Sequence, residues 1–342
     1  MDLNLIWFVL VGVLIAGYAV LDGFDLGIGA LSLFAKSREE RDVHVAAVAP
    51  VWDGNEVWLL TGGGALFAAF PVVYATIFSG FYLALVLVLV ALIARAVSME
   101  FRAAMPEYER AWSLAFGLGS LLPAILFGVA VGNVLRGVPV DVGGVWKGSF
   151  LGLLNPYAIL VGLVSLAMFV MHGALYLRMK SEGALEARMA KVAVGGWAAF
   201  AALFVVATGW SYAISPFLFG RLTSPLTIVL LLVLAAGLVG VPVFTRAGRA
   251  GLAFLSSSVV IVMGLLTVAA NAFPVLVPSS LGLEKSLTVY NASSSPRTLM
   301  TMLVIALVGV PIVIGYTIFA YRVFKGKARP EDGYGAEVKA SA

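Results

Sequence analysis

The sequence predicts an all-α integral membrane protein, and its composition carries most of that prediction. Hydrophobic residues make up 61% of the 342 residues, and the mean hydropathy is +1.03. Charged residues account for only 12%, whereas a soluble domain carries about a quarter. There is no cysteine, which excludes disulfides and thiolate-bound metals. The net charge of +4 is small, so we expect no nucleic-acid partner.

Apolar stretches long enough to cross a bilayer recur along the whole chain. A span needs about 20 apolar residues, and on this measure we expect about nine spans: 3–34, 46–70, 72–102, 112–135, 156–180, 190–214, 225–245, 250–273 and 298–324. The N-terminus has no basic segment, so the first span reads as retained rather than cleaved. We expect residues 1–324 to form a single polytopic membrane domain and residues 325–342 a polar cytoplasmic tail.

Lysine and arginine are distributed unevenly between the two sides of these spans. Seventeen fall after the odd-numbered spans or in the C-terminal tail, with Arg95, Arg102 and Arg110 assigned to the loop after the third span. The opposite side holds five. The positive-inside rule therefore predicts an N-terminus outside and a C-terminus in the cytoplasm.

Acidic residues interrupt the first three spans, and all of them fall in the half nearest the cytoplasm. These are Asp22, Asp25, Asp53, Glu56 and Glu100. A charged side chain at the centre of a bilayer costs about 3 kcal/mol on insertion scales, so such residues face protein or water. A static polar contact between helices would explain them. Their one-sided placement instead favours a water-filled access from the cytoplasm.

The spacing of these acids predicts shared helix faces. Asp22 and Asp25 are three residues apart, as are Asp53 and Glu56, and residues at this spacing face the same way on a helix. Neighbouring carboxylates in a low dielectric raise each other's proton affinity, which suits proton exchange. The alternative is that Asn55 and a tryptophan indole simply satisfy these carboxylates.

The chain has two histidines, His44 and His172. A haem needs two axial ligands on facing helices, and these two residues make an unconvincing pair. We therefore expect no haem, no other cofactor and no metal in this chain, and His172 to be a polar interface or helix-end residue.

These motifs together resemble subunit II of cytochrome bd-type quinol oxidases. The matching segments occur in family order and include Leu21-Asp22-Gly23-Phe24-Asp25 and Val51-Trp52-Asp53-Gly54-Asn55-Glu56-Val57-Trp58. The remaining segments are 63–71, 78–82, 100–102, 132–133, 154–156, 273–274, 278–280, 286–288 and 291–295. No single segment is decisive, but the ordered set is specific.

The resemblance implies two four-helix bundles plus one peripheral helix, in the inner membrane of a prokaryote. It implies a partner, the haem-bearing subunit I, which holds haem b and haem d-type groups and reduces oxygen to water. A small third subunit, membrane lipid and a structural quinone are further partners within the family's range. By position, Asp53 is associated with proton uptake, with Asp22, Asp25, Asn55, Glu56 and Glu100 on the same pathway. Trp58 matches an aromatic position at the oxygen-access route.

The sequence leaves two other functions open. A proton-coupled secondary transporter would break its helices at Asp22-Gly23 and Asp53-Gly54 and bind a coupling ion there. Such a transporter should show paired polar breaks in its second half, but the predicted spans from 156 to 273 contain no acid. A purely structural assembly subunit with inert acids is the other alternative. We expect a non-haem oxidase subunit with no catalytic residue of its own.

Overall fold

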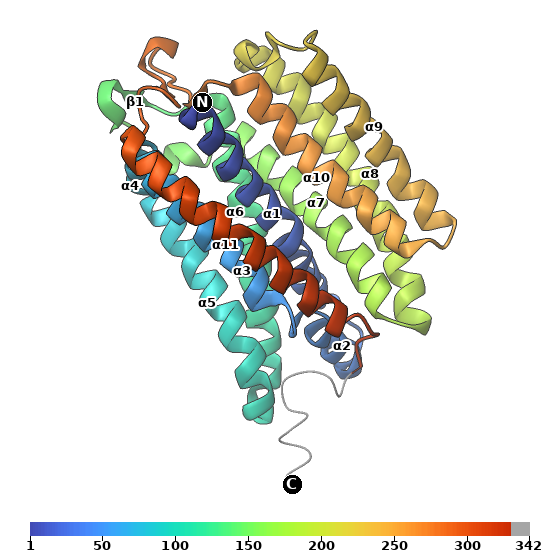
Figure 1. Cartoon of the computed structure of the whole chain (residues 1–342). Coiled ribbons are helices and arrows are strands. Elements are labelled where there is room, and N and C mark those ends of the chain that lie inside the picture. The colour runs from blue at the N-terminus through green and yellow to red at the C-terminus, as the bar shows by residue number, and fades with distance from the viewer. Residues whose placement is uncertain (330–342) are drawn as a thin grey trace.

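The computed structural model describes residues 1–329, and these form long helices that run side by side (Figure 1). Within this range eight segments are long and apolar enough to cross a membrane. They contain α1 (Leu3–Ser32), α5 (Tyr82–Ala104), α6 (Glu109–Arg136), α7 (Pro156–Lys180), α8 (Gly183–Ile214), α9 (Pro225–Arg246), α10 (Ala250–Ala272) and α11 (Pro296–Val323). This confirms the predicted all-α, multi-span fold.

The predicted second span differs from the structure at its start. Residues 46–70 divide into the end of a separate helix, α2 (Arg38–Val48), and α3 (Trp52–Ala69). With 18 residues and two acids in its first two turns, α3 is shorter than each of the eight apolar segments. It is not one of the eight apolar segments, so the total of nine spans stays a prediction.

The predicted third span, 72–102, is wrong as a single helix. It consists of α4 (Pro71–Gly80) and α5, which meet at Phe81. Phe81 has φ −100° and ψ 16°, which interrupts the helix. A Cβ on Gly80 would overlap the Trp146 ring, so the indole needs a glycine at this bend.

Polar caps define where several helices begin. Side chains of Asp2, Ser37, Asn155, Ser224 and Ser295 accept hydrogen bonds from main-chain N–H groups in the first turn of α1, α2, α7, α9 and α11. Such a cap satisfies N–H groups that have no partner inside the helix. Proline at the start of α7, α9 and α11 adds a preset φ angle.

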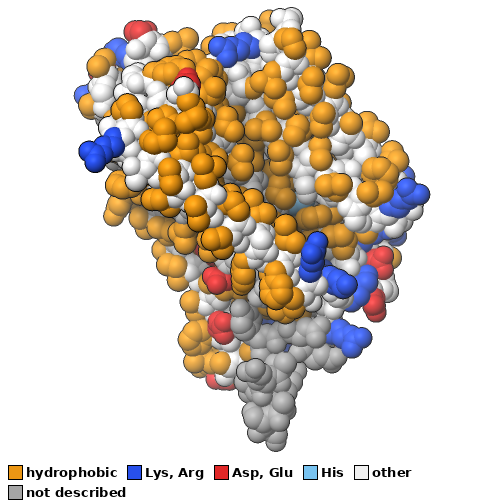
Figure 2. All heavy atoms as spheres, in the orientation of Figure 1, with side chains coloured by type: hydrophobic (Ala, Val, Ile, Leu, Met, Phe, Trp, Pro, Cys, Tyr) orange, Lys and Arg blue, Asp and Glu red, His pale blue; other side chains and the backbone are white. Residues whose placement is uncertain are grey.

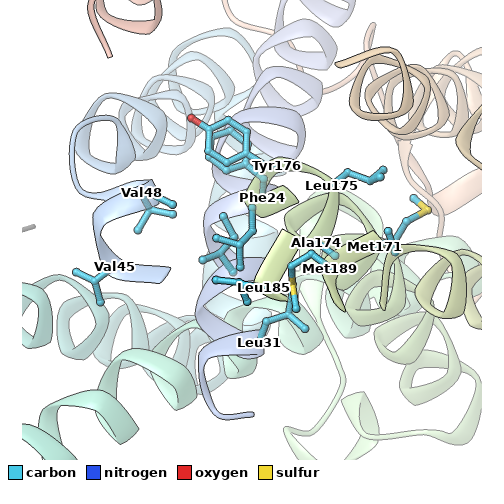
Figure 3. Packing of buried hydrophobic residues seen from close by; sticks show 14 of the residues in the cluster. Phe24, Leu31, Val45, Val48, Met171, Ala174, Leu175, Tyr176, Leu185 and Met189 are labelled. Carbon is cyan, nitrogen blue, oxygen red and sulfur yellow. The ribbon is translucent and has the colours of Figure 1, made fainter. Parts of the chain in front are cut away.

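Helix α1 lies at the centre of the fold and contacts α3, α6, α7 and α10. Its glycines allow this approach. A Cβ on Gly27 would overlap the main chain at Phe169, and a Cβ on Gly29 would overlap the Ser120 side chain. On the same side, Phe24 stacks on Tyr176 of α7 with ring centroids 3.8 Å apart (Figure 3). The α1–α7 contact therefore forms much of the core.

Helix α11 lies at the edge of the bundle. It crosses α1 and α3 (Figure 1), and only Leu299 and Leu303 are buried along it. This agrees with a peripheral helix, while the division of the others into two four-helix bundles stays a prediction.

The two longest connections carry short antiparallel hairpins. One joins β1 (Val140–Asp141) to β2 (Val145–Trp146), and the other joins β3 (Val275–Val277) to β4 (Leu287–Thr288). A bridge between Val138 and Ser279 ties the two connections together. The remaining short elements are 3-10 helices at Pro106–Tyr108, Val142–Gly144, Leu151–Leu153, Pro216–Phe219 and Leu283–Lys285.

Charged side chains gather toward the two ends of the molecule, and apolar side chains cover the face between them (Figure 2). We call the end that holds Leu3 and both hairpins the N-terminal face, and the end that holds α2 and Phe324 the C-terminal face (Figure 1). Most of the predicted tail, from residue 330 onward, lies outside the described residues.

Candidate functional site

A buried arginine joins carboxylates of two other helices. Arg95 of α5 is 1% exposed, and its Nη1 lies 2.8 Å from Oδ1 of Asp22 on α1. Its Nη2 lies 3.2 Å from Oε2 of Glu56 on α3. Asp22 is fully buried, whereas Glu56 keeps 22% of its side chain exposed. One guanidinium thus holds α1, α3 and α5 together where α1 approaches the C-terminal face.

A second group of hydrogen bonds lies beside this ion pair. Asn55 of α3 donates from Nδ2 to Oδ2 of Asp25 at 2.7 Å and to the Leu21 carbonyl at 3.2 Å. The Tyr321 hydroxyl of α11 donates to Oδ1 of Asn55 at 2.8 Å. The two acids of the first predicted pair therefore face different partners, Asp22 a cation and Asp25 an amide. We call Asp22, Asp25, Asn55, Glu56, Arg95 and Tyr321 the polar cluster.

The polar cluster is not fully satisfied by the described residues. Buried polar atoms without a hydrogen-bond partner there are Tyr18 OH, Asp22 Oδ2, Asp25 Oδ1, Trp58 Nε1 and Arg95 Nε. Buried polar groups in native proteins nearly always have a partner, so each of these atoms needs an explanation. These five atoms lie around α1, α3 and α5, and the other unpartnered buried atoms, such as Trp112 Nε1 and Asn271 Oδ1, lie elsewhere among the described residues.

Two of the predicted pathway acids lie outside the polar cluster. Asp53 is exposed in the first turn of α3, and Glu100 is exposed near the end of α5. Neither forms a hydrogen bond or an ion pair with residues 1–329. The sequence predicts that Asp53 and Glu56 share one helix face. In the structure, Asp53 is exposed and Glu56 binds Arg95.

Trp58 lies one helix turn beyond the cluster on α3. Its indole ring packs against Gly17 of α1, where any Cβ would overlap the ring. The Nε1 atom is buried and has no acceptor among residues 1–329. The Trp58 indole N–H therefore does not donate a hydrogen bond to any of the buried carboxylates.

Arg95 was missed by the sequence analysis, which placed it in a loop with Arg102 and Arg110. It lies inside α5, nine residues before the helix ends at Ala104. The apolar run Leu87–Ala96 around it was the available signal, because a cation within such a run needs a buried partner. Even when Arg95 is not counted as a loop residue, basic residues remain more numerous on the C-terminal face than on the N-terminal face. The sequence around Tyr321 contains no comparable indication of a buried polar contact.

Both histidines are fully buried, each in its own setting. In α7, Nε2 of His172 lies 2.9 Å from the Val20 carbonyl and Nδ1 lies 2.7 Å from Ser257 Oγ. This makes His172 the interface residue that the sequence predicts. His44 of α2 donates from Nδ1 to the Glu40 carbonyl at 2.6 Å. Burial lowers the pKa of His44 to about 4.

Among residues 1–329, no group of three or more His, Asp or Glu side chains converges as a metal site. The groups that do converge are carboxylates, an amide, a guanidinium and a phenol. These can hold or pass a proton, but they are not a usual ligand set for haem.

Together these features define a polytopic helical membrane protein with a buried cluster of ionisable residues near one face. Residues 3–324 match the family model for cytochrome bd terminal oxidase subunit II. The chain is 39% identical to the probable cytochrome oxidase subunit 2 of Haemophilus influenzae, covering 95% of each chain. It is 38% identical to the cytochrome bd-I ubiquinol oxidase subunit 2 of Escherichia coli K12, covering 96% of each.

Two further comparisons agree with these. The cytochrome bd ubiquinol oxidase subunit 2 of Bacillus subtilis is 36% identical, with 95% of this chain and 96% of that protein covered. The bd oxidase structure from Geobacillus thermodenitrificans matches the fold with a TM-score of 0.80, at 16% identity and over 95% of this chain and 99% of that one. The chain therefore belongs to the cytochrome bd terminal oxidase subunit II family. It is a multi-pass membrane subunit of an oxidoreductase and works with a subunit I.

Proposed function

We propose that this chain is the non-haem subunit of a quinol:dioxygen oxidoreductase and carries protons from the cytoplasm toward its partner. The similar proteins of Escherichia coli and Bacillus subtilis are named as ubiquinol oxidase subunits, which supports quinol as the electron donor. Haem b and haem d-type groups then belong to subunit I, where oxygen is reduced to water. This chain contributes a polar route and structural support.

The observation that carries the proposal is the charge balance of the polar cluster. Asp22, Asp25 and Glu56 are three carboxyl groups, and Arg95 is the cation that binds two of them. A single guanidinium cannot neutralise three carboxylates, and uncompensated charge is costly in a low dielectric. The cluster is therefore suited to hold an exchangeable proton, and its orphaned polar atoms offer hydrogen-bonding positions for water.

Asp53 supplies the entrance in this proposal. It is exposed at the start of α3, one turn from Glu56, and so can exchange protons with solvent or with a partner group. Glu56 is partly exposed and bound to Arg95, which places it between Asp53 and the buried Asp22. Glu100 lies exposed near the same end of the bundle as a second acid for proton collection.

The orientation follows from the basic residues. Cations at the C-terminal face include Arg102 and Lys180 in the last turns of α5 and α7, and Lys36 and Arg249 in the connections between helices. The positive-inside rule then puts this face in the cytoplasm and the N-terminus outside. The polar cluster lies on the cytoplasmic side, which is where protons for oxygen reduction are drawn. Trp58, deeper along α3, is proposed to border the route by which oxygen reaches the partner.

Purification and deletion test this function against the transporter alternative. The chain should copurify with a haem protein after mild detergent extraction, and its deletion should abolish quinol-dependent oxygen uptake. Expressed without its partner, it should give no stoichiometric haem in a pyridine haemochrome assay. A chain that purifies alone and drives solute uptake in liposomes would overturn the proposal.

A further inference from the structure

A cavity lies at the N-terminal face, away from the polar cluster. It has a volume of about 480 Å³ and lies between the end of α6 and the loop that follows β2. Its lining includes Arg136, Lys147, Ser149 and Ser280, together with the Trp146 ring. Because α6 ends at Arg136 and α7 begins at Pro156, the cavity lies where two spans emerge from the apolar region.

The charges in this cavity are all positive. Its lining contains no aspartate or glutamate, and Arg136 and Lys147 form no ion pair with residues 1–329. The nearby carboxylate of Asp141 forms its ion pair with Lys285 at 3.1 Å, and Lys147 acts on it only through a longer-range electrostatic interaction. A helix C-terminus favours one cation near Arg136, but that effect does not explain why Lys147 lines the same space. On a face with only five basic residues, this is a notable concentration.

The cavity also presents hydrogen-bond donors. The main-chain N–H groups of Gly148 and Ser149 bind no acceptor among the described residues. Gly148 is held close, since a Cβ there would lie 2.7 Å from Pro139 Cγ and 3.0 Å from the Trp146 ring. The indole is fixed in turn by Phe81, with ring centroids 5.5 Å apart. Two cations and free N–H groups around one packed indole are complementary to an anion with several oxygens.

We propose that Arg136, Lys147 and the loop from Trp146 to Gly152 bind a phosphate group at the N-terminal face. Two sources fit this chemistry, the headgroup of an anionic phospholipid and free inorganic phosphate. A lipid source fits the position, because tryptophan and basic residues at the end of a span lie at headgroup level. With the orientation proposed above, this is the outer leaflet. The site does not depend on the proton route, so its failure would leave that proposal intact.

The test uses the assembled oxidase complex carrying Arg136→Gln and Lys147→Gln together. The control removes two exposed cations from the same face, Arg221→Gln and Arg297→Gln. Complexes in mild detergent are titrated with phosphatidylglycerol, phosphatidylcholine or inorganic phosphate. Binding is followed by native mass spectrometry for the lipids and by equilibrium dialysis for phosphate.

The expected result is one binding event whose affinity falls about thirtyfold in the Arg136/Lys147 variant, as the loss of two cations that contact the headgroup predicts. In the control variant the affinity should stay near that of the wild type.

Saturable phosphatidylglycerol binding that phosphate does not displace would identify the lipid headgroup. Phosphate binding with no preference for phosphatidylglycerol over phosphatidylcholine would identify the free anion. Equal affinity in both double variants, or binding of none of the three ligands, would overturn the proposal. Quinol oxidase activity should be unchanged in both variants.

Discussion

Arg95 on α5 binds Asp22 on α1 and Glu56 on α3 at the same time, with N–O distances of 2.8 and 3.2 Å. The fully buried Asp22 and the partly exposed Glu56 are thereby joined through one rigid, permanently charged group. This relationship connects the interior of the bundle to its C-terminal face. It also makes Arg95 a structural requirement as well as part of the proposed route.

Replacing Arg95 with methionine should strongly destabilise the complex. Removal of one partner from a buried ion pair costs about 3–5 kcal/mol because the other charge is left unpaired. Thermal unfolding of the purified complex, followed by haem absorbance, measures the effect. Arg102→Met is the matched control, since Arg102 binds Asp42 and Glu109 at a more exposed position.

Adding Asp22→Asn to the Arg95→Met variant should recover part of that loss, since it removes the unpaired carboxylate. A variant Arg95→Met as stable as Arg102→Met would contradict the structural role assigned to Arg95.

Tyr321→Phe should cost about 1 kcal/mol, because it removes the hydrogen bond to Asn55 without changing the ring. The melting temperature of the complex reports this change. Tyr316→Phe is the control, because Tyr316 is 64% exposed on the same helix and binds no polar group among the described residues. Equal melting temperatures for the two variants would show that α11 is not tied to the polar cluster through Tyr321.

His44 should make the complex less stable in acid. Burial lowers the pKa of His44 to about 4, whereas an unfolded histidine titrates near 6.5. The unfolded state therefore takes up a proton first as pH falls, and stability is lost between about pH 6.5 and 4. From pH 7.5 to pH 5 this one residue should account for about 2 kcal/mol.

The measurement for His44 is thermal unfolding of the complex across this pH range in wild type and His44→Gln. The variant should show a shallower acid loss, because glutamine does not titrate. Identical pH profiles would mean that His44 is not held neutral in the folded protein.

Gly27→Ala should weaken the packing of α1 on α7. A Cβ at this position overlaps the Phe169 main chain, which cannot move as a flexible side chain would. Overpacking of this kind costs about 1–3 kcal/mol. Gly12→Ala is the matched control, because a Cβ there meets nothing within 4 Å. Reduced yield of assembled complex for Gly27→Ala alone is the expected outcome, and equal yields would argue against close α1–α7 contact.

Much of the fold was accessible from the sequence because hydropathy reports directly on membrane spans. Hydropathy is blind to a short interruption between two apolar helices, so the bend at Phe81 was missed.

The candidate site was only partly accessible. Depth along the first two spans drew attention to Asp22, Asp25 and Glu56, which the structure brings into one cluster with Asn55. Their role in proton transfer stays a prediction. Pairing across helices cannot be obtained from spacing within one helix. Arg95 and Arg102 both belong to the third predicted span, and the sequence does not distinguish the buried Arg95 from the arginine in the last turn of the helix. Tyr321 reads in sequence as an ordinary residue near the end of a span.

The proton route is tested most directly by Asp53→Asn in the assembled complex. Asp53 is exposed and forms no hydrogen bond or ion pair within residues 1–329, so the substitution should leave folding unchanged. Glu107→Gln, another exposed acid near the C-terminal face, is the control. Haem content and quinol oxidase rate are measured in the same preparations. We predict full haem content in both variants and a rate that falls about 100-fold or more in Asp53→Asn alone, the scale of a lost acid–base step. Full haem content with an unchanged rate in Asp53→Asn would contradict the account.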